Sequence, residues 1–167
     1  MLEQAKWNVD PTELDPSVQE LWLSVEFGDY ASVAKQLIKA SNNRQPEIKK
    51  SAQVLLAYVN EKLTAVLDDA KSAQESGELW SAYKQYLTMR EQFGGYETDI
   101  NLATVLKELK ADKTVANELA ARKYYERAER RFPKVGMDRT LGMLKGLIEK
   151  YPGTEAANAS QKIIDSQ

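Results

Sequence analysis

Residues 46–76, which decide the fold, have the sequence PEIKKSAQVLLAYVNEKLTAVLDDAKSAQES. After Pro46 the stretch contains no glycine or proline, and apolar residues recur in steps of three and four: Ile48, Ala52, Leu55, Val59, Leu63, Val66, Ala70 and Ala73. The mean step is close to the helical repeat, which predicts one amphipathic helix over about 46–76 with a length of roughly 45 Å. Such a helix must bury its apolar side against neighbouring helices.

The rest of the chain also has a helical character. Ala, Leu, Glu, Lys and Gln are abundant, and no alternating apolar run of strand length occurs. The 8 glycines and 5 prolines fall at intervals that mark helix ends, and Pro133 and Gly136 are expected to break the chain. Asp10, Asp15 and Asp112 precede predicted helices as caps. We therefore expect an all-α fold in a single helical-repeat domain over 1–167, with hairpins at about 16–41, 46–93, 97–132 and 137–165.

Two internal similarities support an arrangement of stacked hairpins. The turn EQFGGYE at 91–97 aligns with EKYPGTE at 149–155. In both, a predicted helix ends at an aromatic residue, two helix-breaking residues follow, and an acidic residue lies near the start of the next predicted helix. Gly28 and Gly77 are each followed by apolar residues at offsets of 2, 5 and 9. The second alignment places Ala82 at a close contact between helices. Hairpins of this kind bury their apolar faces by stacking on one another.

Three segments resemble the hairpins of tetratricopeptide repeats: GDYASVAKQL from Gly28, SGELWSAYKQY from Ser76 and LIEKYPGTEAANAS from Leu147. The last is similar to the variant that is common in bacterial cell-envelope proteins. The resemblance implies a right-handed solenoid that binds another protein, and it slightly favours the periplasm or cell envelope if the chain belongs to a longer exported protein. The long helix at 46–76 departs from a standard repeat of about 34 residues, so a degenerate superhelix is expected.

The composition excludes most routes to catalysis. The chain has no cysteine and no histidine, which excludes thiolate metal sites, cysteine nucleophiles and histidine general bases. Phosphate-loop, dinucleotide and metalloprotease motifs are absent from the sequence. Asp68 and Asp69 form the only adjacent acidic pair, and neighbours on a helix point in different directions. We expect no enzyme activity, no cofactor, no bound metal and, without an apolar stretch of ~20 residues, no membrane span.

Charge is unevenly distributed along the chain. The net charge is -2, so the chain as a whole does not attract nucleic acid, and we expect no nucleic-acid partner. Residues 1–30 are strongly acidic, with seven acids and one lysine. Residues 121–134 carry a net charge of +4, and four cations there share one helix face: Lys123, Arg127, Arg130 and Lys134. This face is interpreted either as solvated surface that complements the helix dipole or as a site for an acidic protein. The acidic end of one copy and the basic face of another also predict weak, salt-sensitive self-association.

Two further sets of residues are candidates for partner binding. If the resemblance holds, a polar stripe on the long helix lines a concave surface, and it consists of Gln53, Asn60, Thr64 and Lys71. Trp80 and Tyr83 lie one turn apart and are interpreted either as packing residues or as an exposed anchor for a peptide. The sequence thus predicts a non-catalytic protein-interaction or scaffold module. The alternatives are a structural spacer or oligomerisation domain and a helical pocket for a small molecule or lipid.

Overall fold

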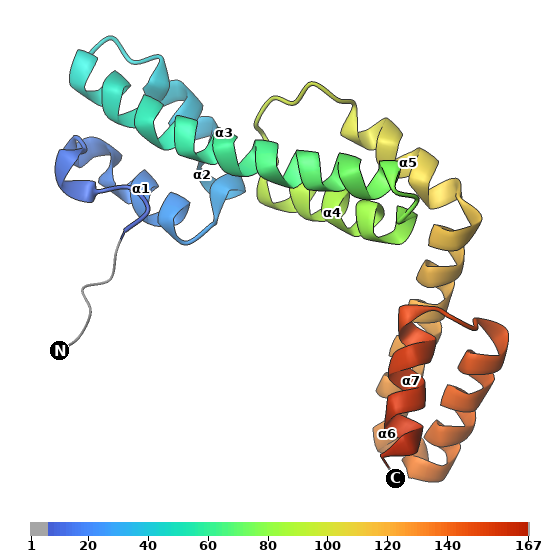
Figure 1. Ribbon diagram of the computed structural model, residues 1–167. Helices are drawn as coiled ribbons and strands as arrows, with labels where there is room; N and C mark the ends of the chain where they lie inside the picture. Colours follow the sequence, from blue (N-terminus) through green and yellow to red (C-terminus); the bar gives the residue numbers. More distant parts are fainter. Residues whose placement is uncertain (1–6, 167) are drawn as a thin grey trace. The chain divides into compact units, whose positions relative to one another are not determined.

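The computed structural model describes residues 7–166, and all regular structure in this range is helical (Figure 1). This confirms the expected all-α class. The elements in chain order are the 3-10 helices η1 (Pro11–Glu13) and η2 (Pro16–Val18), and the α-helices α1 (Gln19–Glu26), α2 (Tyr30–Ser41), α3 (Pro46–Glu75), α4 (Leu79–Gln92), α5 (Leu102–Ala111), α6 (Lys113–Lys150) and α7 (Glu155–Asp165). Within the described range, no helix combines the length and the apolar character that crossing a membrane requires.

The chain divides into two units, with the boundary between Ala103 and Thr104. This differs from the single domain expected from the sequence, and the boundary falls inside the predicted hairpin at 97–132. The first two predicted hairpins are present, since α1 packs on α2 and α3 packs on α4. Within the third predicted hairpin, α5 begins at Leu102 instead of residue 97, and α5 and α6 share few contacts. In the second unit α7 packs on α6.

Helix α3 is the central element of the first unit. It runs without interruption for 30 residues, as its periodicity predicts. Its buried side is formed by Ser51, Ala52, Leu55, Val59, Leu63, Leu67 and Ala70. Leu67 takes the core position expected for Val66, because a step of four and a step of three are equally compatible with the helical repeat. Figure 1 shows α2 along the N-terminal half of α3 and α4 along its C-terminal half, and both helices pack on it.

The start of α2 and the end of α4 meet at an aromatic junction. The rings of Tyr30 and Phe93 stack with centroids 4.9 Å apart and an interplanar angle of 20°. The hydroxyl of Tyr96 donates a hydrogen bond of 3.1 Å to the carbonyl oxygen of Tyr30. Gly95 has a φ of 99°, and a Cβ added to it would lie 3.0 Å from the Cβ of Ala34. Both the backbone conformation and the close approach therefore require glycine at this position.

The two glycine turns predicted to be equivalent have the same backbone geometry. Gly28 and Gly77 have φ values of 80° and 78°. In both turns the glycine N–H donates to the carbonyl three residues earlier at 3.1 Å, and the next N–H donates to the carbonyl five residues earlier at 2.9 Å. This is the Schellman arrangement, which satisfies the last carbonyls of α1 and α3. The internal similarity between these hairpins thus has a structural basis in how the helices end.

The second pair of similar turns matches only in part. The backbone N–H groups of Phe93 and Tyr151 each donate a hydrogen bond of 2.9 Å to the carbonyl oxygen four residues earlier. The side chain of Thr154 then caps α7 by accepting a bond of 3.2 Å from the N–H of Ala157. The aligned residue is Tyr96, whose ring is buried and whose hydroxyl is directed to Tyr30, so it does not supply such a cap. The predicted helix start at 97 fails because the capping residue is missing there.

Helix α6 consists of two arms on either side of Gly136. Asp112 caps the first arm, as predicted, by accepting bonds from the N–H groups of Thr114 at 2.7 Å and Val115 at 3.4 Å. Gly136 has non-helical angles of φ 76° and ψ 177°, and Figure 1 shows the second arm turning back from this point. Pro133 stays inside the first arm and does not break it. Proline lacks a backbone N–H, and near the end of a helical arm this loss affects few bonds.

Ala82 tests the packing of α4 on α3. Its side chain is completely buried, so a larger residue has no space to occupy. We expect Ala82→Leu to lower the free energy of unfolding of the first unit by about 1–3 kcal/mol through overpacking. All three tryptophans of the chain precede residue 104, so urea unfolding followed by tryptophan fluorescence reports on this unit. Ala65→Leu, at an exposed position of α3, is the matched control, and equal stability of the two variants would contradict the packing of Ala82.

Candidate functional site

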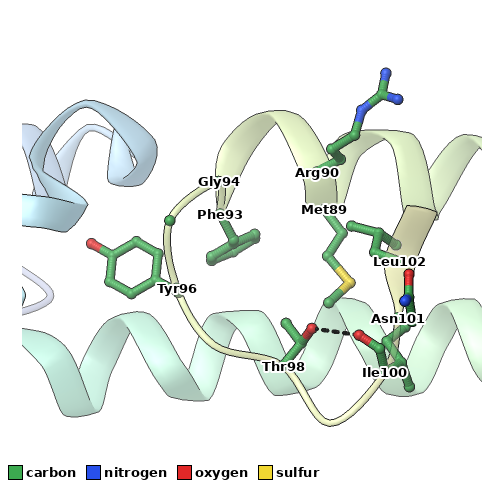
Figure 2. Close-up of a pocket in the computed structure, with 10 residues that line it drawn as sticks. Met89, Arg90, Phe93, Gly94, Tyr96, Thr98, Ile100, Asn101 and Leu102 are labelled. Atoms are coloured by element: carbon green, nitrogen blue, oxygen red, sulfur yellow. Dashed lines mark hydrogen bonds between the residues drawn. The ribbon is translucent and has the colours of Figure 1, made fainter.

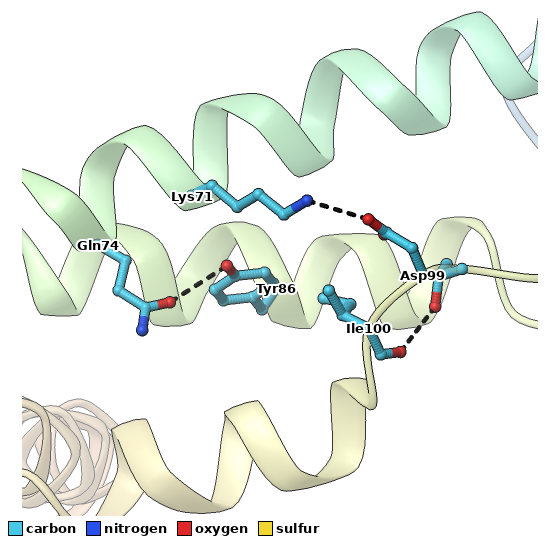
Figure 3. Close-up of polar contacts among 6 residues, drawn as sticks. Lys71, Gln74, Tyr86, Asp99 and Ile100 are labelled. Atoms are coloured by element: carbon cyan, nitrogen blue, oxygen red, sulfur yellow. Dashed lines mark hydrogen bonds and ion pairs between the residues drawn. The ribbon is translucent and has the colours of Figure 1, made fainter.

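The polar stripe of the long helix lies along one exposed edge of α3. Gln53, Asn60 and Thr64 are exposed. Lys71 is partly engaged, because its Nζ lies 3.3 Å from Oδ2 of Asp99, as Figure 3 shows. The two side chains keep 38% and 67% of their surface exposed, so this ion pair is solvated and contributes ~1 kcal/mol at most. The stripe is accessible to a partner, but three of its four members carry no charge.

The Trp80–Tyr83 pair is not an exposed anchor. The two rings stack with centroids 5.8 Å apart and an interplanar angle of 18°. Tyr83 is only 6% exposed, because it belongs to the side of α4 that also buries Ala82 and Tyr86. Trp80 is half-buried, and the Nζ of Lys84 lies 5.5 Å from its ring centroid. Of the two interpretations of this pair, the burial of Tyr83 favours packing.

The four cations predicted to share a face all lie on the first arm of α6 and are exposed. We call Lys123, Arg127, Arg130 and Lys134 the cation row. The row covers 12 residues of helix, from Lys123 to Lys134, and is about 16 Å long. The residues that this arm buries, Val115, Glu118, Ala121 and Ala128, follow the opposite side of the helix. The row therefore faces solvent rather than the interior of the second unit.

Local contacts leave most of the charge of this row unneutralised. Arg130 donates through Nε to the backbone carbonyl of Glu126 at 3.3 Å, which neutralises no charge. The carboxylate of Glu126 is itself paired with Arg122 at 3.3 Å. That pair is exposed, with 64% and 49% of the side-chain surface accessible. Four cations of like sign in a line on one side of a helix repel one another, and an anionic partner relieves that repulsion.

A hollow of about 590 Å³ lies where the chain leaves α4 (Figure 2). Its lining is Met89, Arg90, Phe93, Gly94, Gly95, Tyr96, Thr98, Ile100, Asn101 and Leu102. One of its polar groups is engaged within the loop, because the hydroxyl of Thr98 donates to the carbonyl of Ile100 at 3.0 Å. Arg90 is the only charged residue of this lining.

A smaller apolar hollow of about 220 Å³ belongs to the second unit. It is lined by Tyr125, Glu129, Phe132, Met137, Thr140, Leu144 and Ile163. Burial, and secondarily the neighbouring Glu129, raises the pKa of Tyr125. The lining residues of the first arm follow steps of four and three and lie on the side of the helix opposite to the cation row. The two features are thus separate surfaces.

Among residues 7–166 no group of three or more carboxylates lies close enough together to hold a metal ion. Asp68 and Asp69 are exposed side chains on α3. With no histidine or cysteine in the chain, carboxylates are the principal side-chain metal ligands that remain. The described residues therefore assemble no cluster of three or more such ligands.

Glu118 is an important polar residue that sequence reasoning missed. It is 8% exposed, and its two carboxylate oxygens accept the N–H of Glu155 at 3.2 and 3.1 Å. This places a carboxylate at the first turn of α7, where free N–H groups and the helix dipole favour a negative charge. The signal in the sequence is its position, three residues after Val115 and three before Ala121, on the apolar side of the arm.

We expect Glu118→Ala to lower the free energy of unfolding by about 1–3 kcal/mol, because it removes a part-buried hydrogen bond between a charged carboxylate and the N–H of Glu155. Urea unfolding followed by far-ultraviolet circular dichroism measures the change. Glu149→Ala is the matched control, since Glu149 is an exposed acid on the second arm of α6. A loss for Glu118→Ala no larger than that of the control would show that the cap is not stabilising.

The burial of Tyr96 predicts that the free energy of unfolding depends on pH in the alkaline range. Burial raises the pKa of Tyr96 from 10.0 to about 12. The neutral phenol is thus favoured by folding, and its contribution is present below pH 10 and is lost as the pH rises towards 12. Tyr96→Phe should lower the free energy of unfolding by about 1 kcal/mol at about pH 8. At about pH 11 the parent should lose about 1.4 kcal/mol through ionisation of Tyr96, so the variant should become equal to the parent or slightly more stable. A gap of constant size in urea unfolding at the two pH values would contradict this.

No family model, curated protein or solved structure matches this chain. The functional argument therefore depends on the residues of the chain itself. Of the candidate surfaces, the cation row is the one that combines exposure, alignment and uncompensated charge.

Proposed function

We propose that this chain is a non-catalytic protein-interaction module that binds an acidic protein partner through the cation row. The observation that carries the proposal is the alignment of Lys123, Arg127, Arg130 and Lys134 on the solvent side of the first arm of α6. The two arginines can form paired hydrogen bonds with carboxylates, and the two lysines add point charges. A regular helix of this length holds the four groups at fixed spacing, which reduces the entropy lost on binding.

In this proposal the scaffold is a set of tetratricopeptide-like helical hairpins. The packing of α1 on α2, α2 on α3 and α3 on α4 is sequential, as it is in stacked hairpins. The identical glycine turns after α1 and α3 also favour repeated hairpins. Helix α3 is longer than a helix of a standard repeat, so the arrangement is a variant in which one helix serves two neighbours.

An acidic protein is favoured over nucleic acid as the partner. The chain as a whole has a net charge of -2, and residues 7–29 carry six acids and no base. Such a distribution attracts a polyanion at the cation row and repels it from the acidic N-terminal part of the chain. Four cations on about 16 Å of helix also form a small footprint compared with the many phosphate contacts of nucleic-acid-binding proteins.

The test is the binding of a fluorescein-labelled oligoglutamate peptide, measured by fluorescence anisotropy. The parent chain should bind it at ~10 mM salt and lose most of the binding at ~300 mM, where screening is stronger. Arg127→Glu combined with Arg130→Glu should weaken binding by about tenfold or more, because two attractive charges become repulsive. Lys107→Glu combined with Lys110→Glu makes the same change in net charge at exposed positions of α5 and should leave most of the binding intact.

Three results would overturn the proposal. Equal losses in the two double variants would mean that binding depends on the net charge of the chain and that the cation row is not the site. Absence of binding at low salt would remove the site altogether. Tighter binding of a labelled DNA duplex than of the peptide would replace the acidic protein by nucleic acid.

A further inference from the structure

The N-terminal part of the first unit has the opposite charge to the cation row. Residues 7–29 contain Asp10, Glu13, Asp15, Glu20, Glu26 and Asp29 and no lysine or arginine. Hydrogen bonds from Thr12 and Ser17 lower the pKa values of Asp10 and Asp15, so both remain charged well into the acid range. A segment of 23 residues with six negative charges and none of opposite sign is a second strongly charged surface of the chain. We call residues 7–29 the acidic segment.

The acidic segment also exposes apolar side chains that its own unit does not cover. Phe27 is 74% exposed and Leu23 is 49% exposed. Together with Glu20 they are spaced by three and four residues, so they follow one side of α1 and its C-terminal end. Glu20 and Leu23 line a mainly apolar hollow of about 470 Å³ together with Pro11, Thr12, Gln19 and Trp22. Exposed aromatic residues beside a hollow are typical of interfaces.

We propose that a second copy of this chain is a partner of the cation row and docks on it through the acidic segment. The inference rests on the proposed function, because it names the acidic protein that the row binds. The carboxylates of one copy face the cations of the other, and the aliphatic stems of lysine and arginine cover Leu23 and Phe27. The guanidinium groups of Arg127 and Arg130 can also stack on the ring of Phe27, as arginine does on aromatic faces.

This contact joins two different surfaces, so it is heterologous. Each copy that uses its acidic segment still offers a free cation row, and each copy that uses its row still offers a free acidic segment. Association therefore continues beyond the dimer unless the rotation between copies closes a ring. A single helix face of about 16 Å buries less than a standard interface, so the contact is weak, concentration-dependent and sensitive to salt.

Sedimentation velocity over a concentration series from about 0.02 to about 1 mM tests the contact in the micromolar-to-millimolar affinity range. The weight-average mass of the full chain should rise with concentration at ~10 mM salt and stay near that of one chain at ~300 mM. Phe27→Ser leaves the charge unchanged and should reduce the rise. Val54→Ser is its matched control, since Val54 is an apolar residue of α3 with 44% exposure.

A charge exchange identifies the two surfaces. Glu13→Lys with Glu20→Lys changes the charge of the acidic segment from -6 to -2, and Arg127→Glu with Arg130→Glu changes the charge of the row from +4 to 0, all at exposed positions. Each double variant alone should associate less than the parent at low salt, because the attraction between its two surfaces is reduced. All four substitutions in one chain exchange the charges where these positions face one another, so the association should recover in part. That chain has the same net charge as the parent, so recovery reports on the pairing of the two surfaces and not on the overall charge.

The outcome separates this inference from the proposed function. If the parent chain binds oligoglutamate through the cation row but keeps the mass of one chain at every concentration, the proposed function stands and the second copy is not the partner. Failure of the fourfold variant to recover association would also overturn the inference. As a control, Glu61→Lys with Asp68→Lys places the same charge change on exposed positions of α3, and this variant should associate as the parent does.

Discussion

Burial of the apolar side of α3 is the constraint on which the first unit depends. Helix α3 has 30 residues, and α2 and α4, with 12 and 14, cover successive parts of its length. Neither short helix is long enough to bury the whole stripe, which runs from Ser51 to Ala70. Two hairpins must therefore share one helix. The order of the elements follows from this requirement, since each partner of α3 has to arrive from one of its two ends through a short connection.

Covering α3 with two helices creates a joint where they meet, and the aromatic residues close it. Tyr30 begins α2, Phe93 follows α4, and their stacked rings fill the space between the two helix ends. Tyr96 adds a buried hydrogen bond to the carbonyl of Tyr30, a group at the start of α2. This joint determines the conformation of the chain after α4. With Tyr96 used for packing, no residue caps a new helix there, and a loop leads to α5.

The parts of this structure that the sequence predicts are those governed by local rules. The period of the apolar residues predicts helix α3, the glycines predict where α1 and α3 end, and Asp112 predicts where α6 begins. The start of the third hairpin differs from the prediction because the role of Tyr96 depends on Tyr30, which is 66 residues away. Of the candidate site, the exposure and alignment of the cation row follow from helical spacing alone. The burial of Tyr83 and the cap from Glu118 depend on tertiary neighbours that no local pattern reveals.

The stability of the second unit does not explain the cation row. Its buried side chains and the cap from Glu118 lie on the opposite side of the arm, and the row itself makes only solvated contacts. A cation near the C-terminus of a helix complements the dipole, but this effect acts within the last turn of the helix. Lys123 and Arg127 lie two or more turns before the end of their arm at Gly136 and gain little from it. The helix dipole therefore does not account for Lys123 and Arg127, which is consistent with the proposal that an acidic partner binds them.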